Sequence, residues 1–257
     1  MMAASLVVVA EVSANHLGSL AKAKELVRAI AGSGASHVKF QTYTADTMTI
    51  DHDGPAFRIS DDHELWGGRT LHSLYEEAHT PWEWHEELFS LSRSLGLEPF
   101  STPFDATAVD FLETLNPDLY KIASMEIGDI PLIRRVAQTG RPIIMSTGTA
   151  TLSEVDDAVS AARRAGCTDL TLLLCTSSYP AAPSDVHLSR MNLLRERYDV
   201  PVGLSDHTLG IGVSVAAAAL RASVIERHVT MNRTHAGPEA AFSLEPNELA
   251  DLVVAAT

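Results

Sequence analysis

The sequence predicts a single (β/α)8 TIM barrel, an α/β fold in which eight parallel strands close into a cylinder inside a ring of helices. Short β-branched apolar runs recur along the chain, and an amphipathic helical pattern follows each of them. Eight such pairs are present with none left over. The 257 residues also match the usual size of one barrel, about 250 residues. We therefore expect one domain over residues 1–257.

The strands are expected where the apolar runs lie, at residues 6–12, 38–42, 97–101, 119–123, 142–146, 170–175, 202–204 and 223–229. The following helices are expected at residues 20–31, 80–95, 106–115, 131–138, 153–165, 188–198, 212–220 and 246–255. Two of them open with a capping-box pattern, Thr80 with Glu83 and Thr151 with Glu154. Strict alternation of strand and helix predicts parallel strands joined by right-handed crossovers.

Residues 43–70, after the second strand, form the longest polar stretch without a clear helical or strand pattern. A connection of that length inside a compact domain usually has a function. We expect it to be a loop or lid. A short helix follows it, at residues 71–78.

The chain carries a net charge of −14. This charge argues against nucleic acid or an anionic membrane as a main partner, because both require a basic footprint. No apolar stretch is long enough to span a bilayer, and the first residues lack the basic region of a secretion signal. The only cysteines are Cys167 and Cys175, too few for a disulfide framework. We expect a cytoplasmic protein in which Cys175, on an apolar strand, belongs to the core.

In a (β/α)8 barrel, functional groups lie at the carboxyl ends of the strands. All eight predicted strands end in polar residues, which a purely structural barrel would not need. The strand-end candidates are Glu11, Lys39, Gln41, Thr102, Phe104, Lys121, Ser124, Glu126, Ser146, Thr176, Ser177, Tyr179, Ser205, His207, Glu226 and His228.

Two of the four lysines, Lys39 and Lys121, end adjacent strands within apolar runs. A buried ammonium needs a charged partner. One interpretation is an internal ion pair with Glu11 or Glu126. The other is a site for phosphate and carboxylate, and the strand-end hydroxyls favour it because they add neutral donors. Glu11 and Glu126 are then either lysine partners or general acid/base groups.

His207 and His228 end the seventh and eighth strands, which are neighbours in a closed barrel. Two imidazoles with water can hold one divalent ion such as Mn²⁺, Fe²⁺ or Zn²⁺. Glu226 and Asp206 are candidates to orient the rings from behind. A single strand-end histidine is more often a hydrogen-bonding residue, but the adjacent pair favours a metal site.

Runs at the strand ends resemble the sialic acid synthase family. The matching runs cover residues 10–16, 38–42, 101–104, 120–124, 146–148, 203–208 and 226–228. Within that family the chain is most similar to the pseudaminic acid synthases, on residues 74–78, 80–85, 126–131 and 175–180.

The resemblance implies a transferase that condenses phosphoenolpyruvate with an N-acetylated amino-sugar aldehyde. It implies that phosphoenolpyruvate contacts Lys39, Thr102, Lys121, Ser124, Ser146 and Ser205. His207 and His228 would hold the metal, usually Mn²⁺, and the sugar or the reacting centre would meet Glu11, Gln41, Tyr179 and Glu226. Phe104, Thr176 and Ser177 are expected to line the substrate site, and Glu126 and Glu226 to share the catalysis with Glu11 and the lysines.

Two departures from the family pattern are visible. Gly237-Pro238-Glu239 stands where the family usually has an aspartate, so Glu239 is the candidate carboxylate for the sugar. Family members, which are expected to be homodimers, usually continue into a small antifreeze-like domain. This sequence ends after the eighth helix, so such a domain would be a separate polypeptide or would be absent. Two rival functions are a Schiff-base aldolase using Lys39 or Lys121, and a non-catalytic barrel that binds sugar or phosphate.

Overall fold

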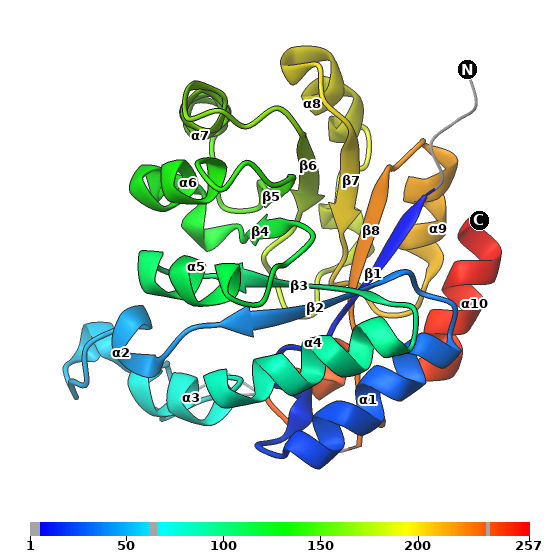
Figure 1. Ribbon diagram of the computed structural model, residues 1–257. Helices are drawn as coiled ribbons and strands as arrows, with labels where there is room; N and C mark the ends of the chain where they lie inside the picture. The colour runs from blue at the N-terminus through cyan, green and yellow to red at the C-terminus, as the bar shows by residue number, and fades with distance from the viewer. Residues whose placement is uncertain (1–5, 62–65, 235–236) are drawn as a thin grey trace.

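A computed structural model of the protein describes residues 6–61, 66–234 and 237–257. Eight parallel strands form a closed barrel in the order β1-β2-β3-β4-β5-β6-β7-β8, with the helices outside it (Figure 1). The predicted fold class is therefore confirmed. The strands are β1 Val7–Glu11, β2 His37–Thr42, β3 Glu98–Pro103, β4 Tyr120–Ile122, β5 Ile143–Ser146, β6 Leu170–Cys175, β7 Val202–Ser205 and β8 Val224–His228.

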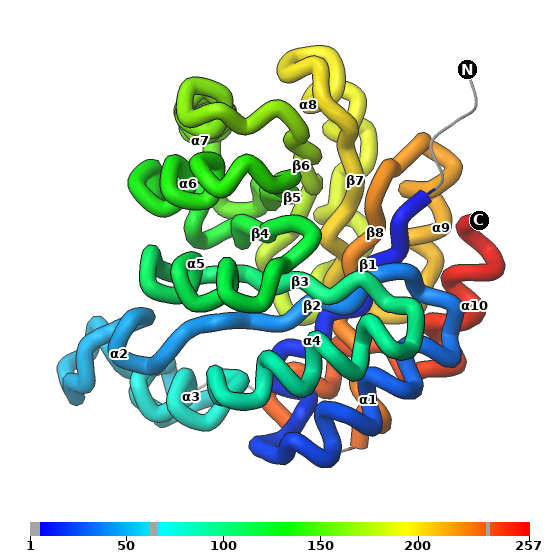
Figure 2. The backbone as a smooth tube through the Cα atoms, viewed as in Figure 1, coloured from blue at the N-terminus to red at the C-terminus, as the bar shows by residue number. Residues whose placement is uncertain are grey.

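Each strand is followed by at least one helix, and the helices surround the barrel, where α1 lies beside α4 and α10 and α6 lies beside α7 (Figure 2). The helices are α1 Leu20–Gly32, α2 Ala45–Met48, α3 Leu71–Ala78, α4 His85–Ser94, α5 Ala106–Glu113, α6 Ile130–Ala137, α7 Leu152–Arg164, α8 Arg190–Tyr198, α9 Gly212–Ala219 and α10 Pro246–Ala256. The observed ends differ from the predicted ones by one or two residues at most elements.

The two predicted capping boxes have different outcomes. Thr151 and Glu154 form a complete box at the start of α7. The Thr80 hydroxyl is buried without a hydrogen-bond partner, and a 3-10 turn, Trp82–Trp84, precedes α4. That prediction was wrong because the turn moves the helix start to His85, too far along the chain for Thr80 to cap it.

Side chains alternate across each strand, so one set faces the helices and the other faces the barrel interior. The larger apolar cluster joins strand residues such as Phe40 to helix residues such as Leu26. A smaller cluster of buried residues comes from the strand segments alone: Val9, Phe100, Leu119, Ile144, Leu173 and Val224. Two positions further along each of these strands the residue is polar or, on β6, a cysteine. The interior is thus apolar at its middle and polar at its carboxyl end, called the mouth below.

Gly203 on β7 lies where two strands approach closely. A Cβ atom on Gly203 would stand 2.2 Å from the carbonyl oxygen of Val224 and 2.8 Å from a methyl group of Leu173. Real Cβ atoms do not come that near to a carbonyl oxygen. The close approach of β7 to β8 therefore requires glycine at this position.

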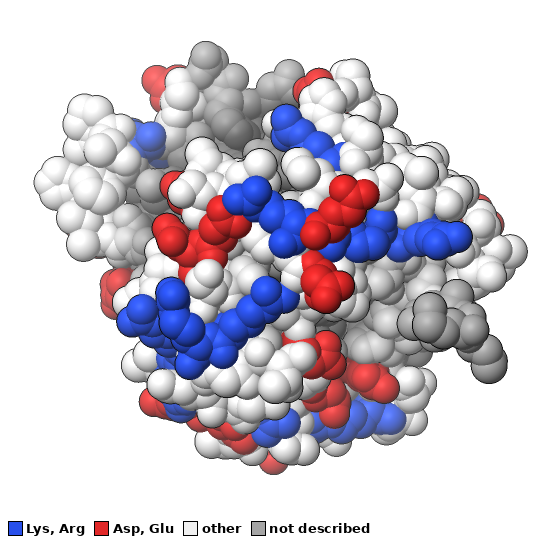
Figure 3. Space-filling model, turned by 90° about the horizontal axis from the view of Figure 1, so that it is seen from above, with Lys and Arg blue, Asp and Glu red and all other residues white. Residues whose placement is uncertain are grey.

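The long polar stretch after β2 contains the short helix α2 and a 3-10 turn, Pro55–Phe57. Arg58 and Thr70 form an antiparallel bridge near its end, and residues 62–65 lie outside the described part. Within the described residues, no helix has the length and apolar character needed to cross a membrane. On the face in Figure 3, basic side chains lie beside acidic ones, and several pairs join neighbouring helices, as Arg197 and Asp156 do at 2.5 Å.

Candidate active site

Lys39 and Glu11 form a buried ion pair at the mouth. They are register partners on β2 and β1, and the Nζ of Lys39 lies 2.8 Å from Oε2 of Glu11. Their side chains are 5% and 0% exposed, so this pair has almost no solvent screening. Both interpretations of Lys39 from the sequence therefore remain open, because an ion pair is present and the ammonium also faces the mouth.

Glu226 on β8 joins the two buried lysines. Its Oε1 lies 3.4 Å from Nζ of Lys39 and 3.7 Å from Nζ of Lys121. The Ser205 hydroxyl donates to the same oxygen at 3.1 Å. Glu126, the other lysine partner suggested by the sequence, makes no ion pair with either lysine in the described structure. That suggestion was wrong because Glu126 lies on the 3-10 turn Met125–Gly128 beyond β4, whereas closure of the barrel brings Glu226 to the lysines.

The four buried charges hold unequal pKa values. Burial lowers the pKa of Lys39, but Glu11 and Glu226 raise it by more, so this ammonium stays charged. Burial lowers the pKa of Lys121, and Glu226 only partly offsets the effect. Burial raises the pKa of Glu226, but the charges of Lys121 and Lys39 outweigh it and the net shift is downward. Burial raises the pKa of Glu11, and Lys39 only partly compensates. Glu226 is thus the fixed anion and Glu11 is the carboxyl that retains a proton more readily.

Hydroxyl groups and a backbone amide surround the lysines. Lys39 donates to Oγ1 of Thr102 at 3.3 Å, and the amide of Gly148 donates to Oγ of Ser124 at 3.0 Å. The Ser146 hydroxyl is buried and has no hydrogen-bond partner. A Cβ on Gly148 would stand 2.5 Å from the hydroxyl oxygen of Ser177 and 2.8 Å from that of Ser124. Several neutral donors therefore converge beside two ammonium groups, which is an arrangement suited to an oxyanion.

Cys175 is buried, as the sequence predicts, but its neighbours are these polar groups and not the two apolar clusters. It ends β6, where it is the register partner of Ser205, and its sulfur lies 3.9 Å from the Ser177 hydroxyl. Burial raises the pKa of the thiol, but contacts with His207 and Ser124 lower it by more. Pairing of β6 with β7 brings His207 beside the thiol, and no local pattern in the sequence indicates that neighbour.

His207 and His228 lie together on the β7–β8 side of the mouth. Their ring centroids are 5.3 Å apart, a spacing at which two imidazoles can bind one ion at metal–nitrogen distances of about 2.1 Å. Tyr179 covers His207 with a centroid distance of 4.4 Å, and Phe242 packs on His228 at 5.2 Å. The pair is therefore backed by aromatic rings. Within the described residues, no cluster of three or more His, Cys, Asp or Glu side chains has a metal-binding arrangement.

The orientation of the His207 ring and the neutral state of His228 fit metal binding. His207 donates from Nδ1 to the Thr176 carbonyl oxygen at 3.0 Å, which leaves Nε2 as the nitrogen that would bind a metal once its proton is lost. Nδ1 of His228 is buried without a hydrogen-bond partner. Burial, followed by the charge of His207, keeps the pKa of His228 well below its ordinary value, so that ring is neutral. Burial lowers the pKa of His207 as well, but the Cys175 contact raises it by more.

In the described structure Asp206 makes no hydrogen bond to either imidazole, contrary to the expectation that it orients the rings directly. Its carboxylate faces the helix side of β7, where Arg227 donates to it at 2.7 Å and Ser214 at 2.5 Å. The hydrogen bond that fixes the His207 ring goes to the Thr176 carbonyl. Alternation along β7 explains the difference, since consecutive residues point to opposite faces.

Glu239 lies beside the histidine pair. Its Oε2 accepts the amide proton of Ala14 at 2.9 Å, and its Oε1 is 3.8 Å from Nδ1 of His228. Burial raises the pKa of Glu239, against hydrogen bonds from Ser13 and Ala14 that lower it. The carboxylate is thus held by the chain after β1, and its second oxygen faces the imidazole.

The remaining candidates lie around the rim of the mouth. Gln41 pairs in register with Thr102, and the Phe104 ring packs on Tyr43 at 5.2 Å. Tyr179 is 38% exposed, so it is accessible from the mouth.

Burial raises the pKa of Glu126 to about 7, against the lowering effect of Lys121.

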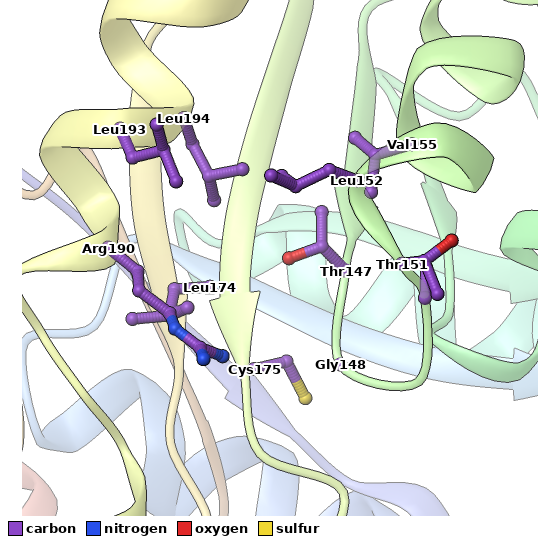
Figure 4. A pocket seen from close by; sticks show the side chains of 11 residues that line it. Thr147, Gly148, Thr151, Leu152, Val155, Leu174, Cys175, Arg190, Leu193 and Leu194 are labelled. Atoms are coloured by element: carbon purple, nitrogen blue, oxygen red, sulfur yellow. The ribbon is translucent and has the colours of Figure 1, made fainter.

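A separate cavity of about 360 Å³ lies between α7 and α8 (Figure 4). Leu152 and Val155 face Leu193 and Leu194 across it, and Arg190 extends toward Cys175. Gly148 and Cys175 line this cavity and also border the hydroxyl groups of the mouth. The cavity itself lies outside the ring of strands and contains neither buried lysine nor either histidine of the pair.

Comparison with known protein families matches residues 26–257 to the NeuB family. The chain belongs to that family. The pseudaminic acid synthase of Helicobacter pylori is 46% identical over 248 residues, which cover 96% of this chain and 72% of the relative. The N,N'-diacetyllegionaminic acid synthase of Legionella pneumophila is 39% identical over 251 residues, covering 96% and 70%.

Solved structures agree. The crystal structure of an N-acetylneuraminic acid synthetase from Leptospira borgpetersenii, in complex with citrate, superposes with a TM-score of 0.87 at 31% identity, covering 98% of this chain and 82% of that one. The resemblance to sialic acid synthases is therefore confirmed. So is the prediction of an enzyme of this NeuB-type synthase class, which forms a carbon–carbon bond.

Proposed function

We propose that this NeuB-family protein condenses phosphoenolpyruvate with an N-acetylated amino-sugar aldehyde to give a nine-carbon 2-keto sugar acid. Phosphate leaves by cleavage of its C–O bond. The acceptor is a 2,4-diacetamido-2,4,6-trideoxy-altrose-like sugar or one like N-acetylmannosamine. The name of the H. pylori relative supports the first of these acceptors.

One observation carries the proposal: Glu226 lies between two buried lysines. Glu226 is on β8, the strand that ends in His228. Lys39 and Lys121 offer two positive charges to an enol phosphate in a chain whose net charge is −14. His228, two residues from Glu226, faces the same mouth and pairs with His207. An anion site and a candidate aldehyde site are thereby adjacent.

The phosphoenolpyruvate subsite comprises the two lysines and the neighbouring neutral donors, Thr102, Ser124, Ser146 and Ser205. The Ser146 hydroxyl supports this assignment, since it is buried without a protein partner and such groups are rare unless a ligand or water satisfies them. The lysines position the enol phosphate and stabilise charge. The sugar lies at the rim of the mouth, against Gln41, Phe104, Thr176, Ser177, Tyr179 and Glu239, and Ser177 also borders the phosphoenolpyruvate subsite beside Gly148.

The reaction joins C3 of the enolpyruvate to the aldehyde carbon, and C2 becomes electron-deficient. Water then adds at C2, and the C2–O bond to phosphate breaks, with its electron pair leaving on phosphate. Glu226, held ionised by both lysines, stabilises the positive charge that develops at C2. Glu11 and Glu126, carboxyls whose pKa values burial raises, are suited to exchange the protons of the water and of the new hydroxyl.

We also propose that His207 and His228 hold a divalent ion, most simply Mn²⁺. When bound, such an ion supplies Lewis-acid polarisation of the aldehyde oxygen. The unpartnered Nδ1 of His228 and the Thr176-oriented ring of His207 support this assignment. Glu239, next to His228, would orient a sugar hydroxyl or amide.

The direct test measures phosphate release from phosphoenolpyruvate with Mn²⁺ and a panel of N-acetylated sugars, with mass spectrometry of the product. Phosphoenolpyruvate labelled with ¹⁸O in the bridging position should give labelled phosphate. His207→Ala and His228→Ala should each abolish turnover, whereas His72→Ala should not, because His72 is a half-buried residue of α3 that pairs with Asp46. Absence of turnover with every sugar, or unlabelled phosphate, would reject the proposal.

The Schiff-base alternative keeps one supporting observation, the lowered pKa of Lys121 beside a second ammonium. In that mechanism the amine of Lys121 attacks a carbonyl and water leaves. Borohydride would then trap the substrate on the protein, and a chelator would not inhibit. We expect the reverse, namely no trapping and full inhibition by the chelator. A barrel that only binds ligand would show phosphoenolpyruvate binding without phosphate release.

A further inference from the structure

An ion pair on the outer side of the barrel lies directly behind the two histidines of the mouth. Asp206 precedes His207, and Arg227 precedes His228. Nη1 of Arg227 lies 2.7 Å from Oδ2 of Asp206, and the two side chains are 1% and 0% exposed. Because side chains alternate along a strand, a pair on the outer side sets the position of inward-facing neighbours.

The pair also holds the chain on the far side of His207. Nη2 of Arg227 donates to the Thr208 carbonyl oxygen at 2.7 Å, and Nη1 donates to that of Gly210 at 2.9 Å. The second carboxylate oxygen of Asp206 accepts the Thr208 amide proton at 2.9 Å. His207 is therefore enclosed by two residues that one guanidinium binds.

The β7–β8 ladder provides only part of this restraint. The register of β7 with β8 ends at Ser205 and Glu226, and the Asp206 amide makes the last backbone hydrogen bond to β8, at the Glu226 carbonyl oxygen. The main chain of His207 is bonded on its other side, to the Ala181 amide, so in the described structure the links from Thr208 and Gly210 to β8 are those of the Arg227 guanidinium. The guanidinium is planar and offers its donors in a fixed geometry, so it can tie that segment to β8 more rigidly than a single bond would.

We propose that Asp206 and Arg227 are positioning residues that fix the spacing of His207 and His228 and thereby set the affinity for the divalent ion. The inference rests on the metal site of the proposed function. A buried ion pair adds little net stability compared with apolar residues of similar size. Its location behind both imidazoles gives it a different role, since groups behind metal ligands commonly change metal affinity about 10- to 100-fold.

Two variants separate positioning from stability. Arg227→Lys keeps the charge but loses the planar fork. The double variant Asp206→Leu/Arg227→Met removes both charges and keeps an apolar filling, so it should fold even if single charge removals do not. Arg141→Lys is the matched control, because Arg141 also binds a carboxylate, Glu113 at 2.7 Å, and a carbonyl oxygen, that of Pro117 at 2.5 Å. Arg141 lies before β5, at the opposite end of the barrel from the histidines.

The measurement is Mn²⁺ binding without substrate, by electron paramagnetic resonance titration, together with urea unfolding and metal-free binding of phosphoenolpyruvate. We expect Arg227→Lys and the double variant to weaken Mn²⁺ binding about 10- to 100-fold, with phosphoenolpyruvate affinity within about twofold of wild type. Arg141→Lys should leave Mn²⁺ binding unchanged. Wild-type Mn²⁺ affinity in either folded variant would overturn the positioning role. If the wild-type protein bound no Mn²⁺, the proposed metal site would fail, and this inference with it.

Discussion

The Nζ of Lys39 lies 2.8 Å from Oε2 of Glu11, and neither side chain is more than 5% exposed. Removing one member of such a pair leaves the other charge buried without its partner, which typically costs about 3–5 kcal/mol. We expect Lys39→Met to lower the free energy of unfolding by that amount. Lys39→Met/Glu11→Gln should recover a large part of it, because the buried Glu11 carboxyl, which has lost the ammonium that lowers its pKa, is gone as well.

Urea unfolding of the two single variants and the double variant measures this coupling. Glu226 remains near Lys121 in all of them, so the cycle reports mainly on Lys39 and Glu11. The surface pair Lys24 and Glu87, with 23% and 55% exposed side chains, provides the control. Its coupling should stay below about 1 kcal/mol. A Lys39–Glu11 coupling as small as that of the surface pair would contradict the prediction.

Gly148→Ala should reduce affinity for phosphoenolpyruvate with little effect on stability. The new methyl group would stand 2.5 Å from the Ser177 hydroxyl oxygen and 3.0 Å from the Cys175 sulfur, within the proposed phosphate subsite. Side chains there can rotate away, so the fold survives while the donors are displaced. We expect at least a tenfold rise in the dissociation constant, equivalent to about 1.4 kcal/mol. Calorimetric titration measures it. Gly32→Ala, with nothing within 4 Å of the new atom, is the control and should bind normally.

Gly203→Ala should have the opposite profile. Here the new methyl group would meet the Val224 carbonyl oxygen at 2.2 Å, and a main chain within the barrel cannot rotate away. We expect a loss of stability of about 1–3 kcal/mol or more, measured by urea unfolding. The folded fraction should still bind phosphoenolpyruvate. A variant as stable as the wild type would show that β7 and β8 can separate without cost.

The sequence predicts the fold and the residues that meet at the mouth, but not their neighbours. The alternation of apolar runs and helices predicts the barrel, and the barrel predicts that Lys39, Lys121, His207 and His228 meet at one end. Both inferences depend on local patterns and on a rule of the fold. The identity of neighbours across the mouth depends on closure of the barrel, which no local pattern encodes.

The differences between expectation and structure have different causes. Glu226 pairs with the lysines in place of Glu126, because β8 returns beside β1 more than 200 residues later in the chain. Cys175 faces the mouth because it stands two residues after Leu173, whose side chain faces the barrel interior, and the pairing of β6 with β7 brings His207 beside it. Asp206 faces away from His207, which alternation along β7 would have predicted once the strand's inward face was known. The Thr80 capping box failed for a more local reason, the 3-10 turn before α4.

Glu126 should give the protein's stability a specific pH dependence. Burial raises its pKa from an ordinary 4.5 to about 7. Between these values the folded protein keeps a proton that the unfolded chain has lost, so this residue's contribution to stability falls as the pH rises from about 4.5 to 7. His16 and His85 act in the opposite direction, because burial lowers the pKa of each to about 4.

A comparison of variants isolates the effect of Glu126 from those of the histidines. Urea unfolding at pH 5, 6 and 7 should show that Glu126→Gln gains stability relative to wild type as the pH rises. Glu196→Gln, at an exposed position of α8, controls for the amide substitution itself. A constant difference between Glu126→Gln and wild type across this range would mean that Glu126 is already ionised in the folded protein at pH 5.

Glu239→Asp should change recognition of the sugar and not of phosphoenolpyruvate. The longer side chain lets Oε2 accept the Ala14 amide proton at 2.9 Å while Oε1 stands 3.8 Å from His228. Shortening the side chain by one methylene prevents the carboxylate from reaching both. We expect the KM for the sugar to rise about 5- to 30-fold, equivalent to one or two kcal/mol, with the KM for phosphoenolpyruvate unchanged. Steady-state kinetics with each substrate varied in turn tests this. An equal rise in both KM values would show that Glu239 maintains the structure of the mouth and does not act on the sugar alone. In that case Glu239→Gln should leave both KM values unchanged, because its amide oxygen can still accept the Ala14 amide proton.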